Sequence, residues 1–248
     1  MHRFYLPSLQ SNENHISITD LDEIHHIKDV LRLKEGARVT VFNGAGEEAT
    51  GVIQSLQKAR ITVAVESVKK ILLAPNRHIT LACAIPKKAK FEFIIEKVTE
   101  LGVHEIIPLI TQRTEIRLDA KGRDAKLRRY RTVAINAAKQ SKRTTVPQIL
   151  PPVRFLDFLA TVSQTAMLCI PCLLGERQHI ADVLTTWRGQ EQRPEIVFCI
   201  GPEGDFTPAE IQAAVERNAI PLSLGDTVLK VDTAAITCVA TAKIFART

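Results

Sequence analysis

The sequence predicts an α/β protein preceded by a small all-β module, and three observations carry this prediction. Short apolar runs separated by turn residues follow one another up to residue 68, which is typical of β-strands. From residue 79 onward, strand-like runs alternate with amphipathic helical segments, the pattern of a parallel sheet covered by helices. Near the end of the chain, two strand-like runs each lead through a glycine turn into a helix, an arrangement at which α/β proteins bind ligands.

The first part of the chain is interpreted as the all-β module. Strands are expected at residues 39–42, 49–56 and 60–68, with spacing typical of a small barrel. The glycine-containing turn at residues 43–46 lies between two strands, so we interpret it as a hairpin and not as a nucleotide-binding loop. A short helix is expected at residues 27–33, and the two histidines before it are interpreted as surface or capping residues.

The pattern changes after a predicted linker at residues 69–77. A strand at residues 79–85, a helix at residues 91–101 that stops at Gly102, and a strand at residues 105–110 follow. This order implies parallel strands, and the apolar stripe of the helix is interpreted as core packing. A further helix and two buried strands are expected at residues 130–141, 167–174 and 196–200.

The first glycine turn carries the sequence GPEGDFTPAE at residues 201–210. Thr207 is expected to cap the following helix, Pro208 to be its first residue and Glu210 to complete a capping box. These signals fix the helix start to within a residue or two. A helix start beside glycines favours polar groups of a ligand, because its backbone N–H groups are free.

The second glycine turn follows a strand-like run at residues 222–225. The last helix is expected to begin at Asp232 or Thr233. Because both turns follow strands of one sheet, they should face the same edge of that sheet. The chain has neither the phosphate-binding loop of ATP sites nor the first-strand glycine motif of NAD sites, so neither ligand is favoured.

The composition is that expected of a soluble globular protein. The 248 residues, 45% of them hydrophobic, suffice for one large domain or two modest ones. The longest apolar segment, residues 167–174, contains Pro171 and is too short to span a bilayer. The first residues have no apolar stretch of the kind that signal peptides carry, so we expect no secretory signal and a cytoplasmic location.

Five cysteines lie mostly inside apolar runs, which suits free thiols buried in a protein of the reducing cytoplasm. Cys169 and Cys172 form a CxxC motif, but it lies in a strand-like run without a second pair or a His partner. We therefore expect neither a metal site nor redox chemistry at this motif.

The basic residues are concentrated in one stretch. Residues 1–75 contain nine Lys/Arg and nine Asp/Glu, whereas residues 113–143 contain eleven Lys/Arg and three Asp/Glu. Part of this stretch, residues 121–123, is expected to form a loop. A solvated helix face is one interpretation, but such a density of like charges would repel itself, so we favour a surface that binds phosphates. Its cations are Arg113, Arg117, Lys121, Arg123, Lys126, Arg128, Arg129, Arg131, Lys139, Lys142 and Arg143.

Several motifs together resemble one protein family. The sequences GPEG at residues 201–204, LG at residues 224–225 and VLKVDTA at residues 228–234 resemble the signature of the RsmE ribosomal RNA uridine-N3 methyltransferases, which belong to the SPOUT class. Spaced motifs in one order are more specific than any one of them. The resemblance is nearly full length and extends to residues 26–36, residues 96–103, Pro108, Arg113 and residues 137–143.

Three residues depart from the usual pattern of this family. Asp205 occupies a position that is more often glycine, Lys230 one that is usually arginine, and Asp232 one that is usually glutamate. All three preserve charge or turn chemistry. They bear on the positioning of a site more than on the class of protein.

The resemblance implies a fold and a cofactor. The implied fold is a PUA-like β-barrel RNA-binding domain at residues 1–70 and a SPOUT-type α/β methyltransferase domain with a deep trefoil knot at residues 76–248. The implied cofactor is S-adenosylmethionine, held by the loops of the knot, and the implied partners are 16S ribosomal RNA of the small subunit and a second copy of the chain. The implied cofactor-binding residues are Leu173, Gly175, Ile200, Gly201, Pro202, Glu203, Gly204, Leu224, Gly225, Leu229, Thr233 and Ala234.

Methylation of uridine N3 requires the loss of the proton on that nitrogen, which calls for a general base or for stabilisation of the deprotonated uracil. Glu203 and Asp232 are the candidate bases, while Lys230 and Arg143 are candidates to stabilise negative charge on a uracil oxygen. Glu203 could instead interact with a helix N-terminus, and Asp232 could be an N-cap. The candidate RNA-binding residues are Arg32, Arg113, Arg123, Arg128, Arg129, Lys139, Lys142 and Arg143.

Two functions of different classes remain open at this point. The favoured one is an S-adenosylmethionine-dependent methyltransferase that acts on N3 of a uridine in 16S ribosomal RNA. The alternative is an RNA-binding or ribosome-assembly protein of the same fold without catalysis. A third interpretation, a methyltransferase that acts on another RNA position, agrees with the same sequence features and also stays open.

Overall fold

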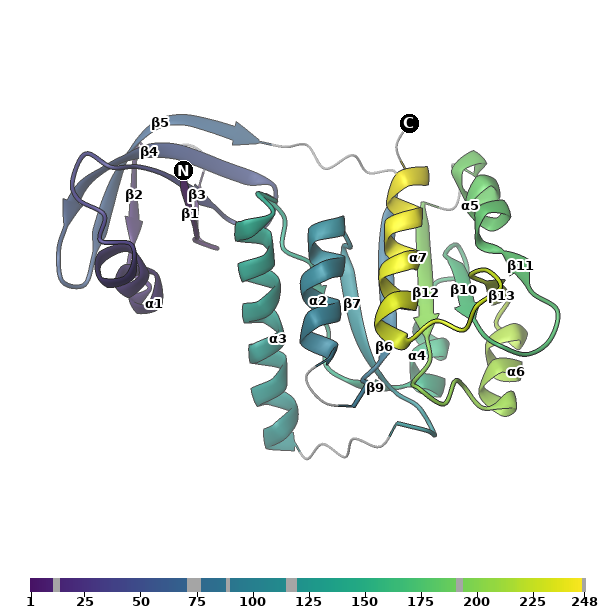
Figure 1. Cartoon of the computed structure of the whole chain (residues 1–248). Helices are drawn as coiled ribbons and strands as arrows, with labels where there is room; N and C mark the ends of the chain where they lie inside the picture. Colours follow the sequence, from purple (N-terminus) through teal and green to yellow (C-terminus); the bar gives the residue numbers. More distant parts are fainter. Residues whose placement is uncertain (11–13, 71–76, 88–89, 115–119, 191–193, 247–248) are drawn as a thin grey trace. The chain divides into compact units, whose positions relative to one another are not determined.

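The structure is a computed structural model that describes residues 1–10, 14–70, 77–87, 90–114, 120–190 and 194–246 (Figure 1). The chain divides into two compact units. The first unit comprises Met1–Leu73 and Ile135–Val146, and the second comprises Ala74–Ala134 and Pro147–Thr248. The segment Ile135–Val146 therefore groups with the β module, although the predicted division placed it in the other domain. The predicted domain boundaries stay a prediction.

The first unit contains a five-stranded sheet with the strand order β1-β3-β4-β5-β2. The pair β1 and β3 is parallel and the other pairs are antiparallel. The three strands predicted here are confirmed as β3, β4 and β5, and the glycine turn joins two of them as expected of a hairpin. The strands are β1 His2–Tyr5, β2 His15–Ile18, β3 Arg38–Phe42, β4 Glu47–Leu56 and β5 Ile61–Lys70.

The helical segment of the first unit begins earlier than predicted. Helix α1 (Leu21–His25) starts after Asp20, whose side chain accepts a hydrogen bond from the backbone N–H of Glu23, and it continues into a π-helical turn, η1 (His26–Val30). The apolar spacing of residues 27–33 did not reveal this capping residue. The segment packs through buried Ile24 and Ile27 on the same apolar cluster as the strands.

The second unit is built on an eight-stranded sheet with the order β11-β13-β10-β12-β6-β7-β8, in which β9 also pairs with β7. All pairings within it are parallel, which confirms the predicted parallel sheet. The strands are β6 His78–Ala84, β7 Glu105–Ile110, β8 Gln148–Ile149, β9 Val153–Arg154, β10 Met167–Pro171, β11 Gln178–His179, β12 Glu195–Ile200 and β13 Ile220–Ser223.

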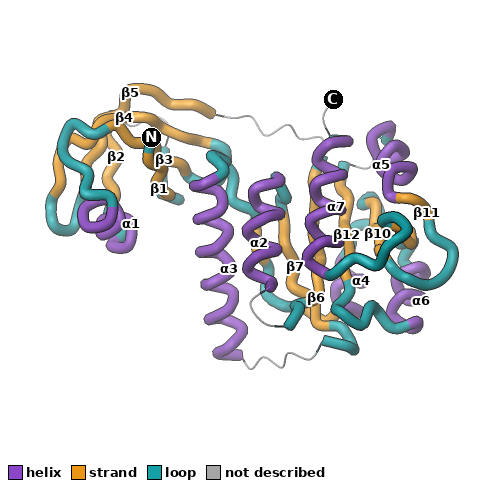
Figure 2. Tube along the Cα trace, viewed as in Figure 1, coloured by secondary structure: helices purple, strands orange, loops and turns teal. Residues whose placement is uncertain are grey.

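Helices cover both faces of this sheet (Figure 2). Helix α7 packs against α2, α5, β6 and β12, whereas α4 packs against α6. Phe155 and Phe158 of α4 share an apolar cluster with Leu168 and Val197 of the strands and Ala214 of α6. The helices are α2 Lys90–Leu101, α3 Ala120–Gln140, α4 Phe155–Thr161, α5 Ile180–Gly189, α6 Pro208–Glu216 and α7 Val231–Phe245.

Two local predictions of the second unit are wrong. Residues 121–123, predicted as a loop, lie in the first turns of α3, because a single glycine costs a helix only about 1 kcal/mol relative to alanine. The last helix begins at Val231, with Lys230 as its extended N-cap, so Asp232 and Thr233 lie within its first turn. Val231, the first residue of the helix, is buried.

Part of the predicted linker, residues 71–76, lies outside the described residues. Among the helices of the described part of the chain, none is both long enough and apolar enough to cross a membrane.

Candidate functional site

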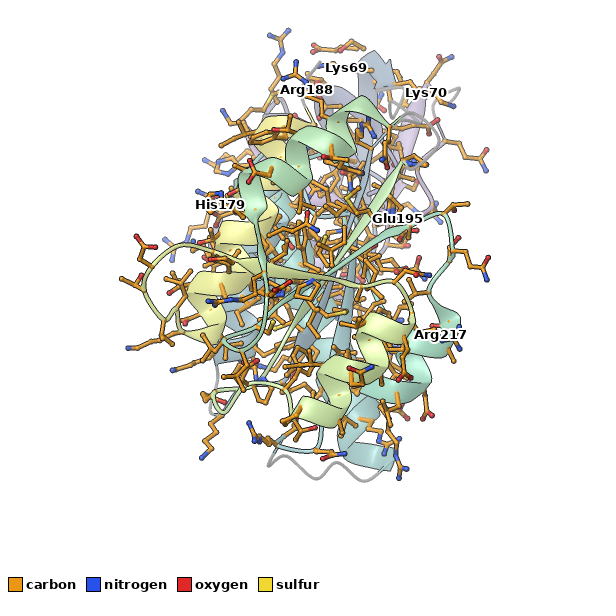
Figure 3. All side chains as sticks on the ribbon, turned by 90° about the vertical axis from the view of Figure 1, so that its right-hand side faces the viewer. Lys69, Lys70, His179, Arg188, Glu195 and Arg217 are labelled. Atoms are coloured by element: carbon orange, nitrogen blue, oxygen red, sulfur yellow. The ribbon has the colours of Figure 1, made fainter. Side chains whose placement is uncertain are left out.

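A cavity of about 320 Å³ lies at the carboxyl ends of β10, β12 and β13 in the second unit. Three loops bound it, at residues 172–177, 201–207 and 224–230. Because β10 lies between β12 and β13 in the sheet, the loops that leave the three strands meet at one edge. Figure 3 shows the molecule turned by 90° from Figure 1, with His179 just before α5 and Arg217 just after α6.

The first glycine turn leads into α6 through the predicted capping box, which is confirmed. The backbone N–H of Glu210 donates to the Thr207 hydroxyl at 3.3 Å, and the Glu210 carboxylate accepts from the backbone N–H of Thr207 at 2.9 Å. Pro208 is the first residue of the helix. Glu210 is buried, and its other oxygen accepts from the backbone N–H of Gln112 at 2.9 Å, so the cap also ties the turn to the segment after β7.

Gly201 lies where the chain leaves β12 and is buried. A Cβ atom at this position would approach the backbone nitrogen of Phe206 to 3.1 Å and the carboxylate of Asp205 to 3.2 Å. Both distances are tighter than ordinary contacts, so the turn closes on itself only because residue 201 has no side chain.

Arg113, predicted to bind RNA, supports this turn in the structure. Its guanidinium donates a short hydrogen bond to the carbonyl oxygen of Gly204 and a longer one, 3.5 Å, to that of Phe206. Two carbonyl groups of the turn thus have a charged donor, which holds them in place. The RNA-binding role of Arg113 stays a prediction.

The second glycine turn is much more exposed. Gly225 has φ +119°, a conformation that residues with a side chain rarely adopt, and a Cβ atom there would meet no atom within 4 Å. Val228 is 75% exposed. Within the turn, the described hydrogen bonds are those between Ser223 and Gly225, both 3.4 Å long.

Charged side chains of both signs line the cavity. The cations are Lys90, Arg177 and Lys230, and the carboxylates are Glu203 and Asp205. Glu203 is exposed, and it accepts a hydrogen bond from the backbone N–H of Lys87 at 3.2 Å. A mixed lining of this kind can bind a ligand that carries both positive and negative groups.

Asp232 lies in the first turn of α7 and does not line the cavity. Its Oδ1 atom is buried and has no hydrogen-bond partner among the described residues. Of the carboxylates proposed as general bases, only Glu203 therefore faces the cavity in this structure.

Most predicted cofactor-binding residues line the cavity, but not all of them. Gly175, Gly204 and Thr233 are not among the lining residues. The assignment of all of these residues to a cofactor stays a prediction. Those that line the cavity are Leu173, Ile200, Gly201, Pro202, Glu203, Leu224, Gly225, Leu229 and Ala234.

Several lining residues were not among the predicted site residues, including Lys90, Cys172 and Arg177. The last two follow β10, and the rule that ligands bind at carboxyl ends of strands could have found them. Burial, and then the charge of Asp205, raises the pKa of the Cys172 thiol, so this cysteine is not an activated nucleophile. Nothing in the sequence around Lys90 indicates its place at the cavity.

The remaining catalytic candidate, Arg143, belongs to the first unit. Its guanidinium donates to the Thr145 hydroxyl at 2.9 Å, and its carbonyl oxygen accepts from Arg3 at 3.0 Å. Burial lowers the pKa of Arg143 to about 10. Lys139, in the same segment, forms a short ion pair with the buried Glu23. Both cations thus have intramolecular contacts that the sequence did not reveal.

The other predicted RNA-binding cations differ in their surroundings. Arg129 on α3 forms a two-point ion pair with Glu92 at 2.5 and 2.8 Å. The side chains of Arg32, Arg123, Arg128 and Lys142 are exposed. Of the basic stretch, Arg117 and the side chain of Lys121 lie outside the described residues. Within the described residues, no group of His, Cys, Asp or Glu side chains is arranged to hold a metal ion.

The fold and the cavity together define a class: an α/β protein with a small-molecule site at the carboxyl edge of a parallel sheet, joined to a five-stranded β unit. The RNA methyltransferase domain family matches residues 74–243, and the RNA methyltransferase PUA domain family matches residues 18–66. The chain belongs to the RNA methyltransferase family that these domains define, which confirms the family expected from the motifs.

Named relatives and a solved structure agree with this membership. The chain is 32% identical to the ribosomal RNA small subunit methyltransferase E of Synechocystis sp., over 86% of this chain and 67% of the relative. It is 29% identical to the protein of that name from Rickettsia conorii, over 98% and 95%. The crystal structure of the Neisseria gonorrhoeae methyltransferase E bound to S-adenosylmethionine is similar, with a TM-score of 0.85, 28% identity and coverage of 98% and 97%.

Proposed function

We propose that this protein transfers a methyl group from S-adenosylmethionine to N3 of a uridine in 16S ribosomal RNA. The observation that carries the proposal is the cavity between the two glycine turns, in a chain whose similar structure from Neisseria gonorrhoeae was solved with S-adenosylmethionine. The relatives named as ribosomal RNA small subunit methyltransferase E support the choice of substrate.

The residues of the cavity fit this cofactor. A volume of about 320 Å³ is at the lower end of the range of about 300–1,000 Å³ that small-molecule sites occupy. The absence of a side chain at Gly225, where a Cβ atom would meet no protein atom within 4 Å, leaves backbone groups open to a ligand, and Leu173, Leu224 and Leu229 supply apolar surface that would suit the adenine ring of the cofactor. Glu203 and Asp205 give the cavity negative charge, which would favour a cofactor that carries cationic groups.

The bound cofactor supplies an electrophilic methyl group, and the chain must supply alignment and proton removal. Uridine N3 loses its proton as the new N–C bond forms and the S–C bond breaks. Glu203 is the carboxylate at the cavity that can accept this proton, and Lys230, also at the cavity, can stabilise negative charge on a uracil oxygen. Val228 and Leu173 lie at the cavity with large apolar surfaces, which can exclude water once RNA covers them.

The proposal also includes the knot, the N-terminal barrel, the cellular location and the oligomeric state that the family resemblance implies. A trefoil knot is implied by the family resemblance, and the strand order is compatible with it: the chain leaves β12, passes β10 to reach β13, and returns to pack α7 on β6 and β12. We further propose a PUA-like barrel at the N-terminus, action in the cytoplasm and a homodimer as the working unit. Light scattering at micromolar concentration tests the dimer, and a fully active monomer would contradict it.

The decisive experiment has two arms. Titration calorimetry of the purified protein should show binding of S-adenosylmethionine or of its demethylated product. Mass spectrometry of 16S ribosomal RNA from a deletion strain should show the loss of one methylated uridine, restored by the wild-type gene and not by a gene carrying Glu203→Gln. Absence of binding heat at millimolar ligand would contradict the enzyme and favour an RNA-binding protein without catalysis.

A separate experiment tests RNA binding through exposed cations of α3. Arg128→Glu combined with Arg131→Glu should weaken RNA binding across sequences and lower the salt slope by about 0.7–0.9 for each lost phosphate contact, with cofactor affinity unchanged. Arg129 is unsuitable because its reversal would also break the ion pair with Glu92. An unaltered salt slope would show that this part of the basic stretch is only a solvated helix face.

A further inference from the structure

Asp205 adopts an unusual backbone conformation in the first glycine turn. Its φ is +61°, in the left-handed region that glycine enters freely and that other residues enter at a cost. Its backbone N–H donates to the carbonyl oxygen of Pro202 at 2.9 Å, which closes the turn. A residue with a side chain at such a position points to a role for that side chain.

The carboxylate of Asp205 joins two loops. One oxygen, Oδ1, accepts from the backbone N–H of Phe206 at 2.7 Å, within its own turn. The other, Oδ2, accepts from the backbone N–H of Leu173 at 3.0 Å, in the loop that follows β10. Because β10 and β12 are neighbours in the sheet, this single side chain ties together the loops that leave both strands.

The surroundings of Asp205 are arranged for this contact. Gly201 leaves the space that the carboxylate occupies, since a Cβ atom at residue 201 would lie 3.2 Å from Asp205 Oδ1. On the other loop, Arg177 donates to the carbonyl oxygen of Cys172 at 3.2 Å. Cys172, Leu173, Arg177 and Asp205 all line the cavity, so the joined loops form one continuous wall of it.

We propose that Asp205 is a positioning residue that holds the loop after β10 against the first glycine turn and thereby sets the wall of the cavity. This inference rests on the proposed function insofar as the ligand is S-adenosylmethionine. Without the carboxylate, the N–H of Leu173 loses its acceptor, and the wall formed by Cys172 and Leu173 becomes free to move. The ligand must then order this loop when it binds, which lowers affinity.

Two substitutions at this residue test the proposal. Asp205→Gly keeps the left-handed backbone but removes both acceptors, so the protein should fold with little change in melting temperature. Its dissociation constant for S-adenosylmethionine should rise about tenfold, or ~1.4 kcal/mol. Hydrogen exchange of the Leu173 amide, measured without ligand, should become at least ~10-fold faster. Asparagine tolerates the same backbone and keeps one acceptor oxygen. The dissociation constant and the Leu173 exchange rate of Asp205→Asn should therefore lie between those of the wild type and of Asp205→Gly.

Asn218→Gly is the matched control. Asn218 also has a left-handed backbone, with φ +62°, but it follows α6 and does not line the cavity. A glycine there changes chain flexibility in the same way and should leave both cofactor affinity and exchange at Leu173 unchanged. The comparison isolates the carboxylate from the backbone.

Unchanged exchange at Leu173 in Asp205→Gly would overturn the proposal, and so would faster exchange with unchanged cofactor affinity. The exchange measurement needs no ligand. If the wild-type protein bound no S-adenosylmethionine, the proposed function would fail, and the Leu173 amide would still report whether Asp205 holds the loop.

Discussion

The two glycine turns that line the cavity differ in how the protein holds them. The first, residues 201–207, is held by several hydrogen bonds. Arg113 donates to two of its carbonyl groups, Asp205 accepts from two backbone N–H groups, and a capping box closes its end. The second, residues 224–230, has hydrogen bonds between Ser223 and Gly225, and its residues 225–228 are exposed.

This difference indicates two ways of building a ligand site. The first turn is already ordered before a ligand arrives, so binding has little conformational entropy to remove there. The second turn offers open space and backbone freedom, and the ligand or the RNA must order it. Substitutions that displace the backbone of the first turn should therefore change both folding and binding, whereas substitutions in the second turn should act mainly on binding.

The largest effect is expected for Gly201→Val. The new side chain would collide with the backbone of Phe206 and the carboxylate of Asp205, so the turn must shift. We expect the free energy of unfolding to fall by about 1–3 kcal/mol and calorimetry to show no cofactor heat. Gly189→Val is the control, because a Cβ atom there meets nothing within 4 Å and Gly189 does not line the cavity. Normal binding by Gly201→Val would mean that the first turn is not pre-ordered.

A smaller effect is expected for Arg113→Ala, which leaves two carbonyl groups of the first turn without their charged donor. Hydrogen bonds of charged groups contribute about 1.5–3 kcal/mol. If this stabilisation of the turn is lost in full from the binding free energy, cofactor affinity should fall by roughly 10- to 100-fold. Calorimetry and RNA binding should be measured on the same preparation. Weaker RNA binding with unchanged cofactor affinity would return Arg113 to the predicted RNA-binding role and contradict the supporting one.

Gly225→Ala should act more weakly on the fold. The added methyl group meets no atom, but the backbone at φ +119° disfavours any side chain. Strain of this kind costs on the order of 1–3 kcal/mol, and an exposed turn can relieve part of it by moving. We expect a severalfold loss of cofactor affinity. The melting temperature should fall by only a few degrees, because each kcal/mol of lost stability lowers it by about 2–4 °C in a protein of this size. A loss of stability as large as that of Gly201→Val would remove the distinction between the turns.

The smallest effect is expected at the opposite edge of the sheet, at Glu105. Burial raises the pKa of Glu105, the nearby Glu195 raises it further, and His78 opposes this shift. The folded state therefore favours the protonated carboxyl. The resulting contribution to stability is fully present below the ordinary pKa of 4.5, and it is lost as the pH rises through the raised pKa of the folded state.

Glu105→Gln, which stays neutral, should raise the free energy of unfolding at pH 7–8 relative to the wild type, and this gain should vanish in mildly acidic solution. Urea denaturation at a series of pH values measures it. Cofactor affinity should not change, because Glu105 begins β7 at its amino end and does not line the cavity. A change in affinity would show that effects on binding are not confined to the carboxyl edge.

Much of the fold could be predicted from local sequence. The strands β3 to β5, the strand-helix-strand unit formed by β6, α2 and β7, and the capping box of α6 were all expected, because periodicity and capping act between residues near one another in the chain. The start of α7 was misplaced because its N-cap residue, Lys230, makes no side-chain capping hydrogen bond and so gives no local capping signal. The start of α3 was missed because Gly122 reads locally as a turn residue.

The sequence by itself determined that two glycine turns end parallel strands, that a basic stretch follows β7, and which family the motifs resemble. Only the tertiary structure decided that β10 lies between β12 and β13, and hence that the loop with Leu173 meets Asp205. Only the tertiary structure gave Arg113 and Arg129 intramolecular partners. The physical reason is that strand order and ion pairs depend on packing between residues far apart in the chain, for which local spacing carries no signal.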